Sequence, residues 1–206
     1  LVETNARIMA SLIPNLLGAS PNAIVIIVSN PCDVLATLAV EQTGADPSRL
    51  FASGCVLDTS RLRLALARRA GVDPRSVHAD IIGEHGDSEF PLWSSARIGP
   101  IPVAEWDASF SPEELDAIAT EVRTAAYKII EGKGATNYAI GLSSTRIVEA
   151  VLRDERAILP VSTVLSGTLD VDGIALSLPS IVGADGAVPL DRIQLSDSEQ
   201  ELLTRS

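Results

Sequence analysis

Cysteine and histidine are scarce in this sequence. Its 206 residues include two cysteines, Cys32 and Cys55, and two histidines, His78 and His85. Two cysteines are far too few for a disulfide framework, so a reducing cytoplasm is the expected location. We predict no bound metal.

Long apolar runs and an excess of basic residues are also missing. No apolar run approaches the roughly 18 residues of a membrane span. Acidic residues outnumber basic ones by 27 to 16, giving a formal net charge of -11. This charge argues against nucleic acid or an anionic membrane as a partner. An anionic small molecule would need local basic residues to bind.

Hydrophobic residues are plentiful, at 46% of the chain, so a sizeable core is expected and disorder is not. The chain opens on Leu1 in a helical pattern, without the charged and apolar regions of a signal peptide. We therefore expect it to be a piece of a longer protein.

Helices and strands alternate in the first part of the chain. Apolar spacing predicts helices at 1–17, 33–42 and 58–70, and apolar runs predict strands at 23–28, 50–52 and 77–82. The run 23–28 is rich in Ile and Val, as in a strand buried in a parallel sheet. This alternation predicts an α/β fold.

The pattern changes after about residue 86. An antiparallel strand pair is predicted at 90–101, helices at 112–132 and 137–153, and a meander at 158–165, 173–178 and around Ile181. Capping boxes open the first of these helices at Ser111 and a last helix at Ser196.

His85 is the first candidate for chemistry. It follows a predicted buried strand, between Gly83 and Gly86, at the strand end where α/β folds bind ligands. One interpretation is a general acid/base. The other is a loop histidine that only makes local hydrogen bonds.

Asp58, Arg61 and Arg63 lie on one predicted helix. Asp58 and Arg61 are three residues apart and share a face, whereas Arg63 is about 200° from Arg61 and points elsewhere. A carboxylate can orient an imidazole, and a guanidinium can grip a substrate carboxylate with two hydrogen bonds. The alternative is an ordinary helix salt bridge contributing about 0.2–0.5 kcal/mol.

Two further polar positions remain open. Asn30, before Pro31 at the end of the first predicted strand, either binds a ligand or shapes the turn. Thr136 precedes a predicted helix, and helix capping is the default interpretation of its role.

Together the motifs resemble the lactate/malate dehydrogenase family, and its L-lactate branch most closely. The matching strings lie in order at 28–33 (VSNPCD), 57–61 (LDTSR), 83–88 (GEHGDS) and 133–141 (KGATNYAIG). The resemblance covers nearly the whole chain. It implies the second half of a Rossmann domain at 1–50 and an α+β catalytic domain at 51–206, with NAD as the cofactor.

The resemblance also implies roles for the candidates. His85 would be the acid/base that protonates the carbonyl oxygen of pyruvate while NADH delivers hydride. Asp58 would hold the imidazole, and Arg61 would bind the substrate carboxylate. Asn30 would contact the substrate oxygen, and the bond before Pro31 would be cis. The remaining implied contacts are Thr136 at the substrate, and Val28, Ser29, Asn30, Ser53, Ser11 and Ile140 at the cofactor.

Arg63 and His78 match a regulatory site in part of the family. Bacterial members activated by fructose 1,6-bisphosphate place an arginine and a histidine at a subunit interface to bind its phosphates. The match therefore implies this activator and a homotetramer. The alternative is a solvated arginine and an ordinary strand histidine.

Two family features have no counterpart here. They are the glycine-rich phosphate loop, and the mobile loop that separates pyruvate from oxaloacetate. We therefore expect the 206-residue chain alone not to bind NAD well or turn over, and one edge of its parallel sheet to be exposed. A malate dehydrogenase, an enzyme for bulkier 2-hydroxy acids and a non-catalytic effector-binding or assembly module remain alternatives.

Overall fold

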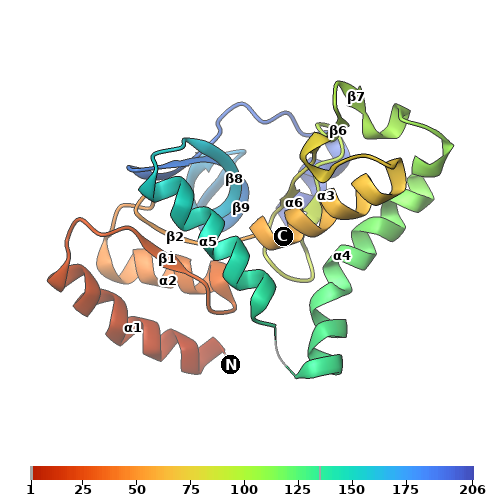
Figure 1. Ribbon diagram of the computed structural model, residues 1–206. Helices are drawn as coiled ribbons and strands as arrows, with labels where there is room; N and C mark the ends of the chain where they lie inside the picture. The colour runs from red at the N-terminus through yellow and green to blue at the C-terminus, as the bar shows by residue number, and fades with distance from the viewer. Residues whose placement is uncertain (1, 135) are drawn as a thin grey trace.

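The computed structural model describes residues 2–134 and 136–206 (Figure 1). Leu1 of the first predicted helix and Ala135 of the fourth matching string lie outside these residues, as does the side chain of Lys133. The predicted α/β class is confirmed, because helices pack on both faces of a mixed sheet.

A five-stranded sheet forms one lobe, with the order β1-β2-β8-β9-β10. Its strands are β1 (Val25–Ile27), β2 (Leu50–Ala52), β8 (Ala157–Thr168), β9 (Val171–Gly183) and β10 (Gly186–Pro189). Strands β1 and β2 pair in parallel, whereas β2 meets β8 antiparallel at Ala52 and Ser162. Strand β1 lies at an edge of this sheet, as expected.

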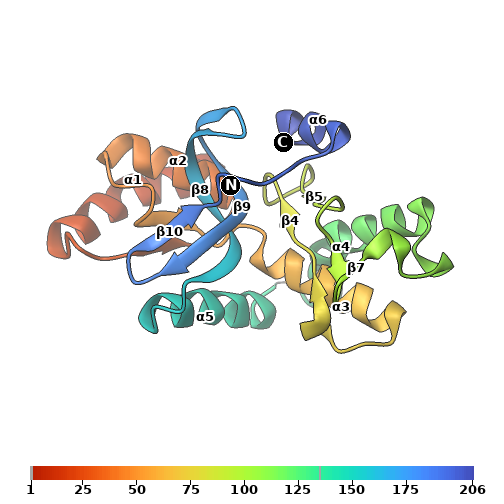
Figure 2. The same cartoon turned by 90° about the horizontal axis from the view of Figure 1, so that it is seen from above.

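Helices cover both faces of the sheet. Helices α1 (Val2–Ala19) and α2 (Cys32–Thr43) lie on one face, and α5 (Tyr138–Leu152) lies on the other (Figure 2).

The cap of α5 corrects a prediction. Asn137, not Thr136, is the N-cap, and its side chain accepts a hydrogen bond from the N–H of Tyr138. The amide oxygen of Asn137 reaches this N–H directly, one residue later than the spacing suggested.

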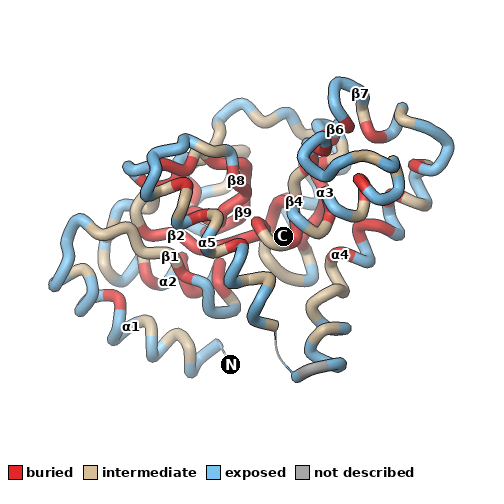
Figure 3. Tube along the Cα trace, viewed as in Figure 1, coloured by how far each residue is buried: buried red, intermediate tan, exposed pale blue. Residues whose placement is uncertain are grey.

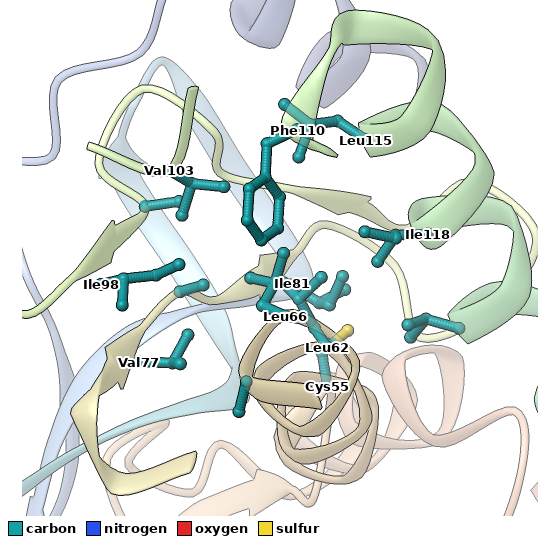
Figure 4. Close-up of a cluster of buried hydrophobic side chains, with 14 residues drawn as sticks. Cys55, Leu62, Leu66, Val77, Ile81, Ile98, Val103, Phe110, Leu115 and Ile118 are labelled. Atoms are coloured by element: carbon teal, nitrogen blue, oxygen red, sulfur yellow. The ribbon is translucent and has the colours of Figure 1, made fainter. Parts of the chain in front are cut away.

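A second lobe surrounds α3 (Val56–Ala70) and α4 (Pro112–Lys133). Short strands cross beside these helices: β3 (Val77–His78), β4 (Ile81–Ile82), β5 (Phe90–Pro91), β6 (Arg97–Ile98) and β7 (Ile101–Pro102). Three 3-10 turns, η1 (Pro74–Ser76), η2 (Val103–Glu105) and η3 (Ala108–Phe110), complete the connections. Leu62 and Leu66 of α3 pack with Ile81 and Phe110 in its core, and Cys55 lies at the end of this cluster (Figure 4).

Three strand predictions were wrong in detail. The antiparallel pair expected at 90–101 is divided, because β5 pairs with β4 whereas β6 pairs with β7. The single strand expected at 77–82 is two strands, because β3 pairs with β6 and β4 with β5. Ile181 belongs to β9, and the last strand of the meander follows at Gly186. Gly186 has φ of +106°, and a Cβ there would lie 2.0 Å from the carbonyl oxygen of Ser48. Only glycine fits at this position, so the turn between β9 and β10 is made here.

The last helix, α6 (Asp197–Arg205), opens with the predicted capping box of Ser196 and Glu199. Buried positions concentrate in the central sheet and the inner face of α3, whereas α1 is largely exposed along its outer face (Figure 3). Over the described residues, none of the helices combines the length and apolarity that crossing a bilayer would require.

Candidate active site

Helix α3 carries the first two site residues. It ends at Ala70 and is capped by Gly71, whose φ of +69° is left-handed. Asp58, in the first turn, is buried, with 3% of its surface exposed. Nη1 of Arg61 donates a hydrogen bond of 2.9 Å to Oδ1 of Asp58. The shared face predicted from the spacing is thus present, and the two side chains form an ion pair.

His85 lies in the loop after β4. The preceding Gly83 has φ of +90°, and its backbone exchanges two hydrogen bonds with Ser177 of β9. This link ties the loop to the central sheet. Nδ1 of His85 lies 2.8 Å from Oδ2 of Asp58, and its side chain is 22% exposed. The structure therefore brings His85, Asp58 and Arg61 together from two segments.

Asp33 holds the backbone of the same loop. Its Oδ2 accepts a 2.8 Å hydrogen bond from the N–H of His85. Burial raises the pKa of Asp33, although the Ser162 hydroxyl and the His85 N–H act in the opposite direction. No role was predicted for Asp33 from the sequence. The sequence signal that could have revealed it was a charged residue at the start of a predicted helix in an α/β pattern.

Charge around the imidazole favours its protonated form. Burial alone would lower the pKa of His85, but the carboxylates of Asp58, Glu89 and Asp33 outweigh it and raise the pKa above its ordinary value. A histidine tuned in this way can hold a proton near neutral pH and release it to a reacting group.

Glu89 and Cys55 complete the cluster, and neither was predicted as a site residue. One ligand atom from each of Cys55, Asp58, His85 and Glu89 lies within 4.8 Å of the others. Side chains of these types bind transition metals in other proteins. The absence of a bound metal remains a prediction from the sequence. The signal available in the sequence was an acidic residue four positions after the candidate acid/base, and its burial is seen only in the structure.

The parallel strands β1 and β2 end near this region. The N–H of Ser53, just after β2, donates a 2.9 Å hydrogen bond to the carbonyl of Ile27 in β1. Val28, Ser29 and Asn30 follow β1 and are exposed, while Ser53 is buried. The peptide bond between Asn30 and Pro31 is cis, as the family resemblance implied. Such strand ends are where open α/β sheets bind ligands.

Three other candidates, Ser11, Thr136 and Ile140, lie on or next to helices. Ser11 is exposed on α1. Thr136 precedes α5 and Ile140 lies in its first turn, and both are partly buried. Helix α5 packs against α3, which carries Asp58. The structure thus places these residues on elements around the site without a described contact to His85.

Arg63 points away from Asp58, as its helical position predicted. Its Nη2 lies 2.7 Å from Oδ1 of Asp80, and its Nε donates to the carbonyl of Ala79. His78 is exposed in β3, two residues before Asp80. Both candidate effector residues therefore lie close to Asp80, Arg63 through its ion pair and His78 through the chain.

Two family models divide the chain between them. The lactate/malate dehydrogenase NAD binding domain matches residues 1–52, and the lactate/malate dehydrogenase alpha/beta C-terminal domain matches residues 55–206. The chain belongs to the lactate/malate dehydrogenase family. It combines part of the NAD-binding domain with the C-terminal domain, as the resemblance implied.

Curated relatives support the same assignment. An L-lactate dehydrogenase of Synechococcus sp. is 46% identical and one of Bifidobacterium animalis subsp. lactis is 45% identical, each over 100% of this chain. The chain covers 67% and 66% of their lengths, so it spans about two thirds of these proteins.

Solved structures of the family share the fold. A lactate dehydrogenase from a Medee basin deep-sea metagenome library superposes with a TM-score of 0.94 at 39% identity, over 98% of this chain and 66% of that one. The minor L-lactate dehydrogenase of Enterococcus mundtii, in a ligand-bound form, also gives 0.94, at 38% identity, over 100% of this chain and 66% of that one.

Proposed function

We propose that this chain supplies the substrate-binding and proton-transfer part of an NAD-dependent L-lactate dehydrogenase that interconverts pyruvate and L-lactate. The observation that carries the proposal is the 2.8 Å contact of Nδ1 of His85 with Oδ2 of Asp58, with Arg61 on the same face of α3. An imidazole and a guanidinium thus stand beside the same buried carboxylate, which supports an acid/base role for one and substrate-carboxylate binding by the other.

The residues have complementary tasks in this reaction. Protonated His85 gives its proton to the carbonyl oxygen of pyruvate, and the Asp58 carboxylate stabilises the imidazolium before this transfer. Arg61 binds the substrate carboxylate through its guanidinium. Arg61 also lines a cavity of about 470 Å³ between α3 and α4, but this cavity is not lined by Asp58 or His85. In the reverse direction, neutral His85 takes the hydroxyl proton of lactate.

NAD is the proposed cofactor, and the residues present fit its nicotinamide end. When bound, it supplies or accepts the hydride. Val28, Ser29 and Asn30 are exposed at the end of a strand whose neighbour ends at Ala52, just before Ser53. Such strand ends are where a dinucleotide binds in this type of sheet. We propose these residues, with Ser11 and Ile140, for the cofactor side, and Asn30 and Thr136 for the substrate side.

The choice of pyruvate over oxaloacetate rests on the fourth matching string and on relatives named L-lactate dehydrogenase. Thr136 and the Ala139–Gly141 stretch favour the lactate branch. A lactate-like malate dehydrogenase is the second candidate, because the loop that separates the two substrates has no counterpart in this sequence.

We further propose a cytoplasmic homotetramer activated by fructose 1,6-bisphosphate through Arg63 and His78. Exposed apolar faces support assembly. On α1, Ile8, Leu12 and Leu16 are 52%, 44% and 43% exposed at spacings of four residues, so they form a stripe on one side of the helix. Stripes of this kind are typical of interfaces between subunits.

The test is NADH oxidation by the full-length product of the gene, including any glycine-rich segment that it encodes. Pyruvate and oxaloacetate are compared, each with and without fructose 1,6-bisphosphate. We expect a preference for pyruvate that the bisphosphate strengthens, and a loss of turnover in His85→Gln. A preference for oxaloacetate that is indifferent to the bisphosphate would instead identify a malate dehydrogenase.

A further inference from the structure

Glu89 is a buried acid next to the candidate acid/base. Only 4% of the residue is exposed. Its Oε2 lies 3.9 Å from Nδ1 of His85, the same nitrogen that faces Asp58 at 2.8 Å. Two carboxyl groups therefore converge on one side of the imidazole.

Few hydrogen bonds hold Glu89 in this position. The described side-chain hydrogen bond is a weak one of 3.9 Å from the Cys55 thiol to Oε2. A carboxylate buried with so little compensation is costly, and a neutral carboxylic acid is not. Accordingly, burial first and the Asp58 carboxylate second raise the pKa of Glu89 to about 8.

We propose that Glu89 is a positioning residue of the acid/base site, a second carboxyl that faces the Asp58 side of the imidazole and controls when His85 releases its proton. This inference rests on His85 being the acid/base of the proposed function. While Glu89 keeps its proton, the negative charge beside Nδ1 of the imidazolium is that of Asp58. Once Glu89 ionises, a second negative charge stands 3.9 Å from Nδ1 and holds the proton on His85 more tightly.

The other charges near Glu89 set the balance. Asp58 favours its protonated form, whereas His85, Arg123 of α4 and Arg61 of α3 favour its ionised form. Asp33 faces His85 from α2, and the Cys55 thiol is neutral because burial and then Glu89 raise its pKa. The three basic groups do not offset the burial of Glu89 and the charge of Asp58.

It follows that His85 and Glu89 titrate as a pair. When two such groups interact, their protons leave in two steps that belong to the pair rather than to either residue. The range of pH in which the site holds one transferable proton is then wider than an isolated imidazole would give. Glu89 itself transfers no proton to the substrate in this arrangement.

The test uses the histidine NMR signals of the 206-residue chain, in a chelator so that no metal contributes. His78 and His85 are the only histidines, so exposed His78 serves as an internal reference for folding. In the unaltered chain, we expect a broad titration of His85 that includes two steps. In Glu89→Gln, we expect a single step at lower pH, with proton affinity about fivefold weaker, the effect of one charge about 4 Å away even at water-like dielectric.

Two further variants make the result specific. Glu89→Asp keeps an ionisable group and should restore part of the shift. Asp87→Asn removes an exposed acid two residues from His85. The Asp87 carboxylate accepts a hydrogen bond from the Tyr127 hydroxyl, so this variant should leave the His85 titration close to that of the unaltered chain. An unchanged His85 titration in Glu89→Gln, with a native His78 signal, would overturn the proposal. Because no turnover is needed, that result would leave the dehydrogenase proposal standing, and a failed dehydrogenase assay would leave this titration standing.

Discussion

Nδ1 of His85 lies 2.8 Å from Oδ2 of Asp58, although the two residues are 27 positions apart in the chain. The contact forms for two reasons. Asp58 is buried in the first turn of α3, and the backbone hydrogen bonds between Gly83 and Ser177 hold the loop after β4 against the central sheet. Both partners are thus fixed by the fold, and the pair is pre-organised for proton transfer.

The first prediction concerns Asp58→Asn. Burial lowers the pKa of His85, and the Asp58 carboxylate raises it. Without this carboxylate the pKa of His85 should fall, and its proton affinity should weaken at least about tenfold. Histidine NMR measures this directly, and NADH oxidation by the full-length product should fall by a similar or larger factor. Asp73→Asn alters an exposed acid paired with Arg75 and serves as the control. An unchanged His85 titration would show that Asp58 does not stabilise the imidazolium.

A second prediction concerns stability against pH. The pKa of Glu89 is raised to about 8, and that of His85 is raised above 6.5. Between about pH 6 and 8, the folded state therefore binds more protons than the unfolded state. The free energy of unfolding should fall as pH rises through this window, by at most about 1.4 kcal/mol per pH unit for each proton concerned.

Urea unfolding at several pH values between 6 and 8 measures this slope. Glu89→Gln should flatten it, because one of the two titrating groups is gone. Asp73→Asn should not, since the pKa of Asp73 is lowered to about 2 and the group stays ionised throughout the window. A slope of the opposite sign in the unaltered chain would contradict the prediction.

Much of this site was visible in the sequence, and the reason differs between residues. Helical spacing alone placed Asp58 and Arg61 together and turned Arg63 away, because the geometry within one helix is regular. The proximity of His85 to Asp58 came from family resemblance, since no local pattern reports a contact across 27 residues. Glu89 was missed because a lone glutamate in a mixed run is normally solvent-exposed. Its burial depends on packing between segments.

The fold shows the same division. Element types were predicted well where apolar periodicity was strong, as in α3, whose predicted end at Ala70 is observed. The predicted strand at 77–82 was divided because β3 and β4 find different partners. The cap at Asn137 instead of Thr136 depended on which side-chain oxygen reaches the first N–H. The division of the strand depends on tertiary neighbours, and the cap depends on local side-chain geometry; apolar periodicity encodes neither.

A third prediction follows from the Arg63–Asp80 ion pair. Asp80 already occupies the guanidinium proposed to bind a phosphate of fructose 1,6-bisphosphate. Asp80→Asn should free Arg63 and remove a repulsive charge, so the bisphosphate should activate the full-length product at a concentration several-fold lower. Arg63→Ala should abolish activation while leaving the basal rate in place. Weaker activation in Asp80→Asn would mean that the ion pair orients Arg63 for the effector rather than competing with it.

The last prediction concerns the exposed stripe on α1. Replacing Ile8 and Leu12, which are 52% and 44% exposed, by glutamate would bury charge in any interface that covers this face. The full-length product should therefore dissociate to smaller species in analytical ultracentrifugation. The same change at Ile101, an apolar residue 39% exposed in β7 of the other lobe, controls for the added charge. Unchanged assembly in the α1 variant, with unchanged unfolding, would contradict this prediction and place the subunit contacts on another surface.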